Sequence, residues 1–177
     1  MNLFLENIKR FSKPSIMLFS FLLFALVLIS VNVFFAPNFK YLTQSFNYTP
    51  ERAYLILSEY GEAGRMTHLK VLAADIIMVI LYTIFFSTAI YSTFSRILNY
   101  RAMVSVLCII PFILALIQAL EVLGVFTLLI SYPNRMFRLA RIVNIITMAK
   151  FTCTYICFLL PFIGVIGLII KRIFVKI

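Results

Sequence analysis

The chain has 177 residues, of which 63% are hydrophobic and 12% charged, and its 16 lysines and arginines outnumber six acids to give a net charge of +10. A soluble domain of this size is about 45–50% apolar and about 25% charged. The composition therefore excludes an ordinary cytosolic enzyme, a disordered chain and a small cysteine-stapled secreted domain. It predicts an all-α integral membrane protein, with residues 1–177 forming a single transmembrane domain.

Four apolar runs are long enough to cross a membrane, since a spanning helix needs ~20 apolar residues. They cover about residues 15–36, 69–93, 102–131 and 145–170. The first run is longer than the apolar core of a signal peptide, and no clear cleavage site follows it, so we interpret it as a retained span. The pattern predicts an integral membrane four-helix bundle.

A short helix is predicted between the first two spans. Thr49 supplies a hydroxyl cap, Pro50 occupies the first helical position, and Glu51 lies near the positive end of the helix dipole. Gly61 can end the helix in a left-handed conformation. We expect a short amphipathic surface helix at about residues 50–60, which lies on the membrane surface or caps the bundle.

Four spans place both termini on one side of the membrane. That side carries eight basic residues in short flanks: Lys9, Arg10, Lys13, Arg96, Arg101, Lys171, Arg172 and Lys176. The other side carries seven, four of them spread over the long first loop: Lys40, Arg52, Arg65, Lys70, Arg135, Arg138 and Arg141. Because basic flanks favour the cytoplasm, we expect a multi-pass cell-membrane protein with both termini cytoplasmic. The basic residues indicate the lipid bilayer, and no nucleic acid, as the partner.

Three charged residues lie well inside the apolar runs, namely Asp75, Glu121 and Lys150. A charge at the centre of a spanning helix costs on the order of 2.5–3.5 kcal/mol, so such residues usually face the bundle interior. When residues are counted from the ends of the predicted spans and converted to depth by the helical rise, all three lie within about 15 Å of the outer boundary of the membrane. Asn32 in the first span lies at a similar depth, so every span offers a polar group to one layer.

Helical spacing adds two residues to this layer. Tyr82 lies seven residues after Asp75, and Gln118 lies three residues before Glu121. Two acids and one lysine leave one negative charge, which Arg65 or a ligand amine can balance. The candidate ligand-binding set is therefore Asp75, Glu121, Lys150, Tyr82, Gln118, Asn32 and Arg65. Two other interpretations remain open: a buried ion pair that only fixes helix packing, and extension of Asp75 and Lys150 to the headgroups.

Other residues carry weaker signals. The chain has no phosphate-binding glycine loop, no HExxH and no Ser-His-Asp set, so we expect no catalytic residues, metal site or cofactor. The single histidine, His68, is expected to be structural at the membrane surface. The three cysteines are expected to pack as small hydrophobes. Gly164 and Gly167 are predicted to allow close approach between helices.

Part of the chain resembles an uncharacterised group of small bacterial four-span integral membrane proteins of unknown function. The resemblance covers roughly residues 48–155. It depends on Thr49-Pro50-Glu51, Gly64-Arg65, Asp75, Tyr82, Glu121 and Lys150. The sequence departs from the pattern at Val79, where the group has Pro, and at Val122, where it has Asn. The resemblance implies the same topology and the same candidate site, and it carries no activity.

These observations predict a polytopic membrane protein that binds a small amphipathic ligand or a lipid headgroup at the Asp/Glu/Lys cluster near the outer leaflet. One alternative is an accessory or assembly subunit of a membrane complex, with a membrane-protein partner or a second copy of the chain. Another alternative is a small proton or ion carrier.

Overall fold

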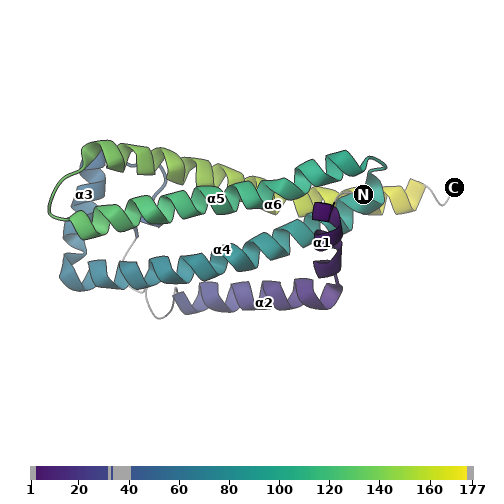
Figure 1. The fold of residues 1–177 in the computed structure, drawn as a ribbon, viewed down its shortest axis with the longest axis horizontal. Helices are drawn as coiled ribbons and strands as arrows, with labels where there is room; N and C mark the ends of the chain where they lie inside the picture. The colour runs from purple at the N-terminus through teal and green to yellow at the C-terminus, as the bar shows by residue number, and fades with distance from the viewer. Residues whose placement is uncertain (1–2, 32, 34–40, 175–177) are drawn as a thin grey trace. The chain divides into compact units, whose positions relative to one another are not determined.

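The structure is a computed structural model that describes residues 3–31, 33 and 41–174. Within these residues the regular elements are all helices, and no strand occurs. In chain order they are α1 (Leu3–Phe11), α2 (Pro14–Ser30), the short 3-10 helix η2 (Leu42–Gln44), α3 (Pro50–Glu59), α4 (Gly61–Ile97), α5 (Arg101–Ser131) and α6 (Phe137–Phe174) (Figure 1). The all-α prediction is confirmed.

Three of the helices are long and apolar enough to cross a membrane. α4, α5 and α6 have 37, 31 and 38 residues, and at 1.5 Å per residue each exceeds the ~30 Å of a hydrocarbon core. α1 and α2 pass the same test only as a pair, and they are bent by 75° at the break between them. The described residues therefore contain three candidate spans, or four if the bent pair forms one. The predicted first span coincides with α2 up to Ser30, and its remainder lies largely outside the described residues.

Two long helices begin earlier than the apolar runs predicted. α4 begins at Gly61 rather than at residue 69, and α6 begins at Phe137 rather than at residue 145. Hydropathy alone missed these turns because they are amphipathic. In the first turns of α6, Ala140 and Val143 are fully buried while Arg138 is exposed. One face of these turns is therefore apolar and packs in the core, while the other face carries charged residues.

The chain divides into two compact units. Unit 1 contains Met1–Phe24, Ile80–Leu114 and Cys153–Ile177, and unit 2 contains Ala25–Val79 and Ala115–Thr152. Each of the three long helices therefore contributes one part of its length to each unit.

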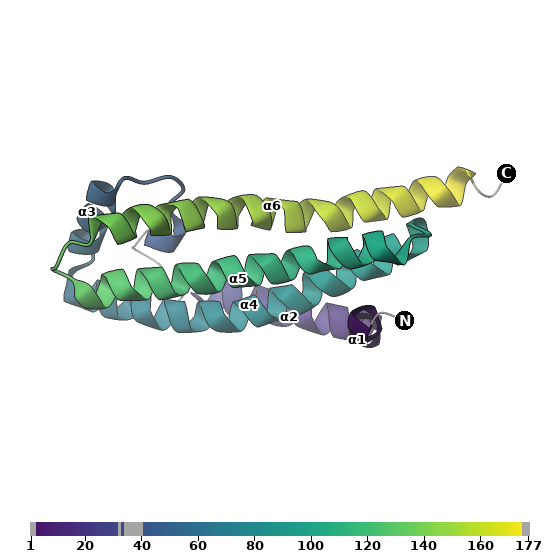
Figure 2. The same ribbon diagram turned by 45° about the horizontal axis from the view of Figure 1, so that its top comes forward.

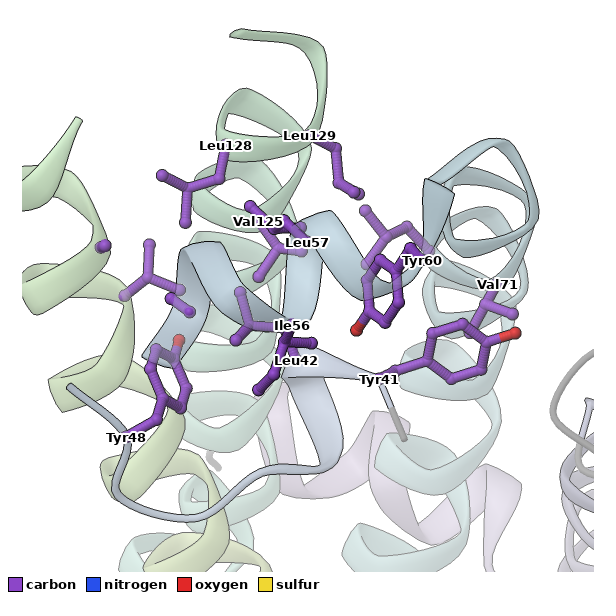
Figure 3. Close-up of a cluster of buried hydrophobic side chains, with 14 of the residues drawn as sticks. Tyr41, Leu42, Tyr48, Ile56, Leu57, Tyr60, Val71, Val125, Leu128 and Leu129 are labelled. Carbon is purple, nitrogen blue, oxygen red and sulfur yellow. The ribbon is translucent and has the colours of Figure 1, made fainter. Parts of the chain in front are cut away.

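In unit 2, α3 lies across the ends of the long helices (Figure 1). Its residues Ala53, Tyr54, Ile56 and Leu57 are buried, whereas Leu55 and Glu59 are exposed. Figure 3 shows the cluster that this face joins, in which Leu42, Leu57, Val125 and Leu128 are fully buried. The predicted amphipathic helix is confirmed, and within unit 2 it acts as a cap.

The boundaries of α3 follow from its own residues. The Thr49 side chain accepts a hydrogen bond of 3.2 Å from the Arg52 backbone N–H, as expected of an N-terminal cap. Gly61 has a φ of 60°, the left-handed conformation that the sequence predicted. This residue lets α4 begin directly after α3.

Unit 1 contains α1, which packs through Leu5 and Ile8 against Ile90, Val104 and Cys108. Figure 2 shows α1 as a short helix that turns away from the direction of α2. In the same unit, a β-carbon at Gly164 would lie 2.4 Å from Thr93 Oγ1, and one at Gly167 would lie 3.0 Å from the side chain of Ile97. The prediction that these two glycines allow close helix approach is confirmed.

Candidate functional site

A buried ion pair joins α5 and α6 in unit 2. The Nζ atom of Lys150 lies 2.8 Å from Oε2 of Glu121. Glu121 is fully buried and Lys150 is 8% exposed. Both side chains are buried, so each charge depends on the other and on nearby hydrogen bonds for its stabilisation.

Two further groups complete the hydrogen bonding of this pair. The Thr147 hydroxyl donates to Glu121 Oε1 over 2.6 Å, and Lys150 Nζ donates to the backbone carbonyl of Thr43 over 2.7 Å. Thr147 lies on the same face of α6 as Lys150 because three residues separate them. Both carboxylate oxygens of Glu121 are thus engaged, and the ammonium of Lys150 links α6 to η2.

Asp75 on α4 extends the pair into a cluster of three charges. Its side chain is buried, with 8% of the residue exposed, and its charge interacts with those of Lys150 and Glu121. Ionisation of both acids gives the cluster a net charge of −1. A buried site with unbalanced charge favours either protonation of an acid or the approach of another cation.

Gln118 and Arg65 occupy different parts of unit 2. Gln118 is buried on α5, one turn before Glu121. The guanidinium of Arg65 lies 4.3 Å from the ring centroid of Tyr132, and its Nη1 donates to the Leu57 carbonyl over 3.4 Å. The observed contacts of Arg65 therefore hold the turn between α5 and α6 against the α3 cap.

Of the remaining two candidates, the structure describes only one. Tyr82 belongs to unit 1, where its ring packs near those of Phe24 and Phe86 at centroid distances of 6.5 and 6.4 Å. Asn32 lies outside the described residues. The structure thus brings together Asp75, Glu121 and Lys150, with Gln118 one turn away.

Two tyrosines that the sequence analysis did not select attach the cap to α6 and the turn before it. The Tyr54 hydroxyl donates to the Asn134 carbonyl over 3.4 Å and accepts a hydrogen bond from the Met136 backbone N–H. The backbone N–H of Tyr48 donates to Asn144 Oδ1 over 3.0 Å. These partners are 80 or more residues apart in the chain, so no local pattern points to them.

The side chain of Tyr48 also belongs to the surroundings of the ion pair. Burial raises the pKa of Tyr48 to about 12, and the negative charge of Glu121 acts in the same direction. The phenol therefore stays neutral at physiological pH. It adds a polar but uncharged wall beside the Glu121 carboxylate.

His68 lies in the interior of unit 2 rather than at a surface. It is fully buried, and the rings of Tyr41 and Tyr60 lie 4.7 and 5.6 Å from its ring centroid. Among the described residues, neither ring nitrogen has a hydrogen-bond partner. The sequence predicted a structural histidine at the membrane surface, and the structure shows that these two tyrosines, from outside α4, bury it within unit 2.

In the described part of the chain, no group of three or more His, Cys, Asp or Glu side chains is placed to hold a metal ion. No known protein family, curated protein or solved structure matches the chain. The resemblance to small bacterial four-span proteins therefore stays a prediction.

Proposed function

We propose that the chain is a polytopic membrane protein with four spans and both termini in the cytoplasm, and that α1 and α2 belong to the first span. The apolar surface of the long helices supports membrane insertion. On α5, Leu116, Leu123 and Ile130 follow one another at seven-residue intervals and are 62%, 63% and 58% exposed. A continuous exposed apolar stripe of this kind suits contact with lipid tails.

Within this protein, we propose that the Asp75–Glu121–Lys150 cluster binds a small amphipathic ligand or lipid headgroup that carries a cationic amine near the outer leaflet. The observation that supports this proposal is the charge balance of the cluster. Glu121 and Lys150 neutralise each other, and both oxygens of Glu121 are engaged. Asp75 is therefore the acid available to an additional cation.

A primary ammonium group is the ligand chemistry that fits best. It can donate a charge-assisted hydrogen bond to a carboxylate, which is about twice as strong as a neutral one. The apolar helix surfaces on either side suit the hydrocarbon part of an amphipathic molecule. Phosphatidylethanolamine has both features, whereas phosphatidylcholine carries a quaternary amine that cannot donate.

Native mass spectrometry of the full chain in mild detergent tests this proposal. We expect phosphatidylethanolamine adducts on the wild type and about tenfold weaker binding to Asp75→Asn, because one charge-assisted hydrogen bond is lost. Glu62→Gln is the matched control, since it removes an exposed carboxylate from the same helix. Equal adduct levels in wild type and Asp75→Asn, or equal binding of phosphatidylcholine, would contradict the proposal.

A second candidate function is supported by the completeness of the Glu121–Lys150 pair. A buried pair with its hydrogen bonds satisfied can serve packing alone, and the chain would then act as an accessory or assembly subunit. This alternative predicts that Asp75→Asn leaves lipid adducts unchanged. It also predicts that a membrane-protein partner or a second copy of the chain stays bound during purification in mild detergent.

A further inference from the structure

A cavity in unit 1 lies against α1, separate from the cluster described above. Its volume is about 600 Å³. Its walls come from α1, from the last turns of α4 and from the beginning of α5. The residues that line it are Leu5, Glu6, Lys9, Arg10, Tyr91, Ser95, Leu98, Arg101 and Val104.

The charged residues of this cavity are mostly basic. Lys9, Arg10 and Arg101 supply three positive charges and Glu6 supplies one negative charge, which leaves a net charge of +2. The three basic side chains are exposed, and none of them forms an ion pair within the part of the chain that the structure describes. The cavity therefore presents positive charge that its one carboxylate, Glu6, balances only in part.

The amphipathic pattern of α1 places the basic residues here. Leu5 and Ile8 are three residues apart and are buried against α4 and α5. This packing orients α1 so that Lys9 and Arg10, in its last turn, line the cavity together with Arg101 at the start of α5. Basic residues also suit this position because the C-terminal end of a helix carries partial negative charge.

A phosphate group is the ligand that this charge recognises. Arginine binds phosphate oxygens through its planar set of donors, and lysine adds a mobile point charge. Apolar walls from Leu5, Leu98 and Val104 lie beside the basic residues. A phosphate joined to an apolar body uses both parts of the cavity, whereas a free inorganic anion uses only the basic part.

The surface around the cavity favours a lipid as the source of this phosphate. Large apolar side chains on α1, on α5 and on the turn before α5 are exposed, among them Leu3 at 74%, Tyr100 at 73% and Met103 at 54%. Hydrocarbon chains would cover these side chains and water would not. We propose that this cavity binds the headgroup phosphate of an anionic phospholipid, with Lys9, Arg10 and Arg101 as its ligands.

Fluorescence quenching in vesicles tests this binding directly, because the chain contains no tryptophan. Tyr91→Trp places a single reporter in the cavity wall. The full chain is reconstituted in phosphatidylcholine vesicles that contain an equal fraction of dibrominated phosphatidylglycerol or dibrominated phosphatidylcholine. We expect stronger quenching by the brominated phosphatidylglycerol.

A second reporter distinguishes a site from general lipid contact. Tyr155 on α6 is 70% exposed, so Tyr155→Trp should be quenched equally by the two brominated lipids. Equal quenching at Tyr91→Trp as well would overturn the proposal. A preference for phosphatidylglycerol of the same size at both positions would also overturn it, because general attraction of the basic chain to anionic lipid would then explain the effect.

Charge variants assign the effect to the three basic residues. In the Tyr91→Trp background, the combined change Lys9→Gln, Arg10→Gln and Arg101→Gln should reduce the preference by about tenfold or more. The matched control removes three exposed arginines from unit 2: Arg135→Gln, Arg138→Gln and Arg141→Gln. The control should keep the preference, and a loss of the same size in both triple variants would overturn the assignment.

Two further measurements show whether the cavity variant is folded and whether the phosphate belongs to a lipid or to a free anion. The cavity variant must retain the helical circular-dichroism signal of the wild type, and its quenching at Tyr155→Trp must be unchanged, which shows that the chain is folded and inserted. Inorganic phosphate is then added, with chloride at equal ionic strength as the reference. No extra effect of phosphate supports a lipid ligand, whereas specific reversal by phosphate would overturn the lipid assignment in favour of a free anion.

Discussion

The two units bury different kinds of polar group. In unit 1 the buried polar residues are hydroxyl side chains, such as Ser87 and Thr93, which donate to carbonyls of their own helix over 2.6 and 3.0 Å. In unit 2 the buried groups include the charges of Asp75, Glu121 and Lys150. A hydroxyl that is hydrogen-bonded within its own helix can pack against many kinds of neighbouring side chain. A buried charge instead requires a hydrogen-bonding or oppositely charged partner from another element.

This difference indicates where the fold depends on one specific arrangement. Lys150 must reach both Glu121 on α5 and the carbonyl of Thr43 at η2, so a shift of either segment leaves a buried charge without its partner. None of the charged side chains of unit 1 that the structure describes is fully buried; Lys171, for example, is exposed and donates to the Arg96 carbonyl over 2.7 Å. Breaking equivalent contacts in the two units should therefore have very unequal effects.

The largest expected effect comes from Lys150→Met. This change leaves the Glu121 carboxylate buried without its ammonium partner, and we expect the free energy of unfolding to fall by ~3–5 kcal/mol. Lys171→Met is the matched control in unit 1. Because that ammonium is exposed, its removal should cost no more than ~1 kcal/mol. Reversible unfolding in mixed detergent micelles measures both values.

The same experiment includes a rescue. The triple variant Asp75→Asn, Glu121→Gln, Lys150→Met removes every charge of the cluster and should regain much of the lost stability, because no uncompensated buried charge remains. If Lys150→Met costs no more than Lys171→Met, the contrast between the units is wrong. If the triple variant is as unstable as the single one, the loss reflects packing around the lysine stem rather than charge.

An intermediate effect is expected in the glycine contact of unit 1. A β-carbon at Gly164 would lie 2.4 Å from Oγ1 and 2.6 Å from Cβ of Thr93. Gly164→Ala should therefore destabilise the protein by ~1–3 kcal/mol through overpacking. Gly167→Ala is the control, since its nearest neighbour is the end of the Ile97 side chain at 3.0 Å, which can move aside. Thermal unfolding of the two variants in detergent should separate them, and equal midpoints would contradict close packing at Gly164.

Sequence predicted the parts of this molecule that local chemistry determines. The helix expected at residues 50–60 is observed at Pro50–Glu59 because its cap, its proline and its first acid all lie within three residues of one another. The matched depths of Glu121 and Lys150 placed them in one layer, since spanning helices share the membrane normal as a common axis. The structure shows these two residues in contact.

Contacts made by irregular backbone could not be predicted in this way. Thr43 and Lys150 are 107 residues apart, and the contribution of Thr43 is a backbone carbonyl that any residue type could offer. Tyr48 likewise reaches the pair from a loop without periodicity. The burial of His68 depends on Tyr41, which precedes it by 27 residues in another segment. Such contacts follow from how the loop folds over the helix ends, which residue spacing does not encode.

The smallest expected effect concerns an exposed charge in unit 2, Glu51 in the first turn of α3. Hydrogen bonds from its own backbone N–H and from the Thr49 hydroxyl hold the pKa of Glu51 below its ordinary value, and the charge of Arg141 adds to this. A depressed pKa means that the ionised form stabilises the folded state above the ordinary value and that this stabilisation is lost as the pH falls through the folded value. We therefore expect Glu51→Gln to be slightly less stable than the wild type at pH 6, and the difference in stability to disappear toward pH 3.

Glu59→Gln, at the other end of α3, is the control. It removes an exposed pair with Arg52 at 3.8 Å and should be nearly neutral at pH 6. Unfolding of the three proteins between pH 6 and pH 3 measures these differences, and a gap between the wild type and Glu51→Gln that stays constant with pH would show that the carboxylate does not act through the start of the helix.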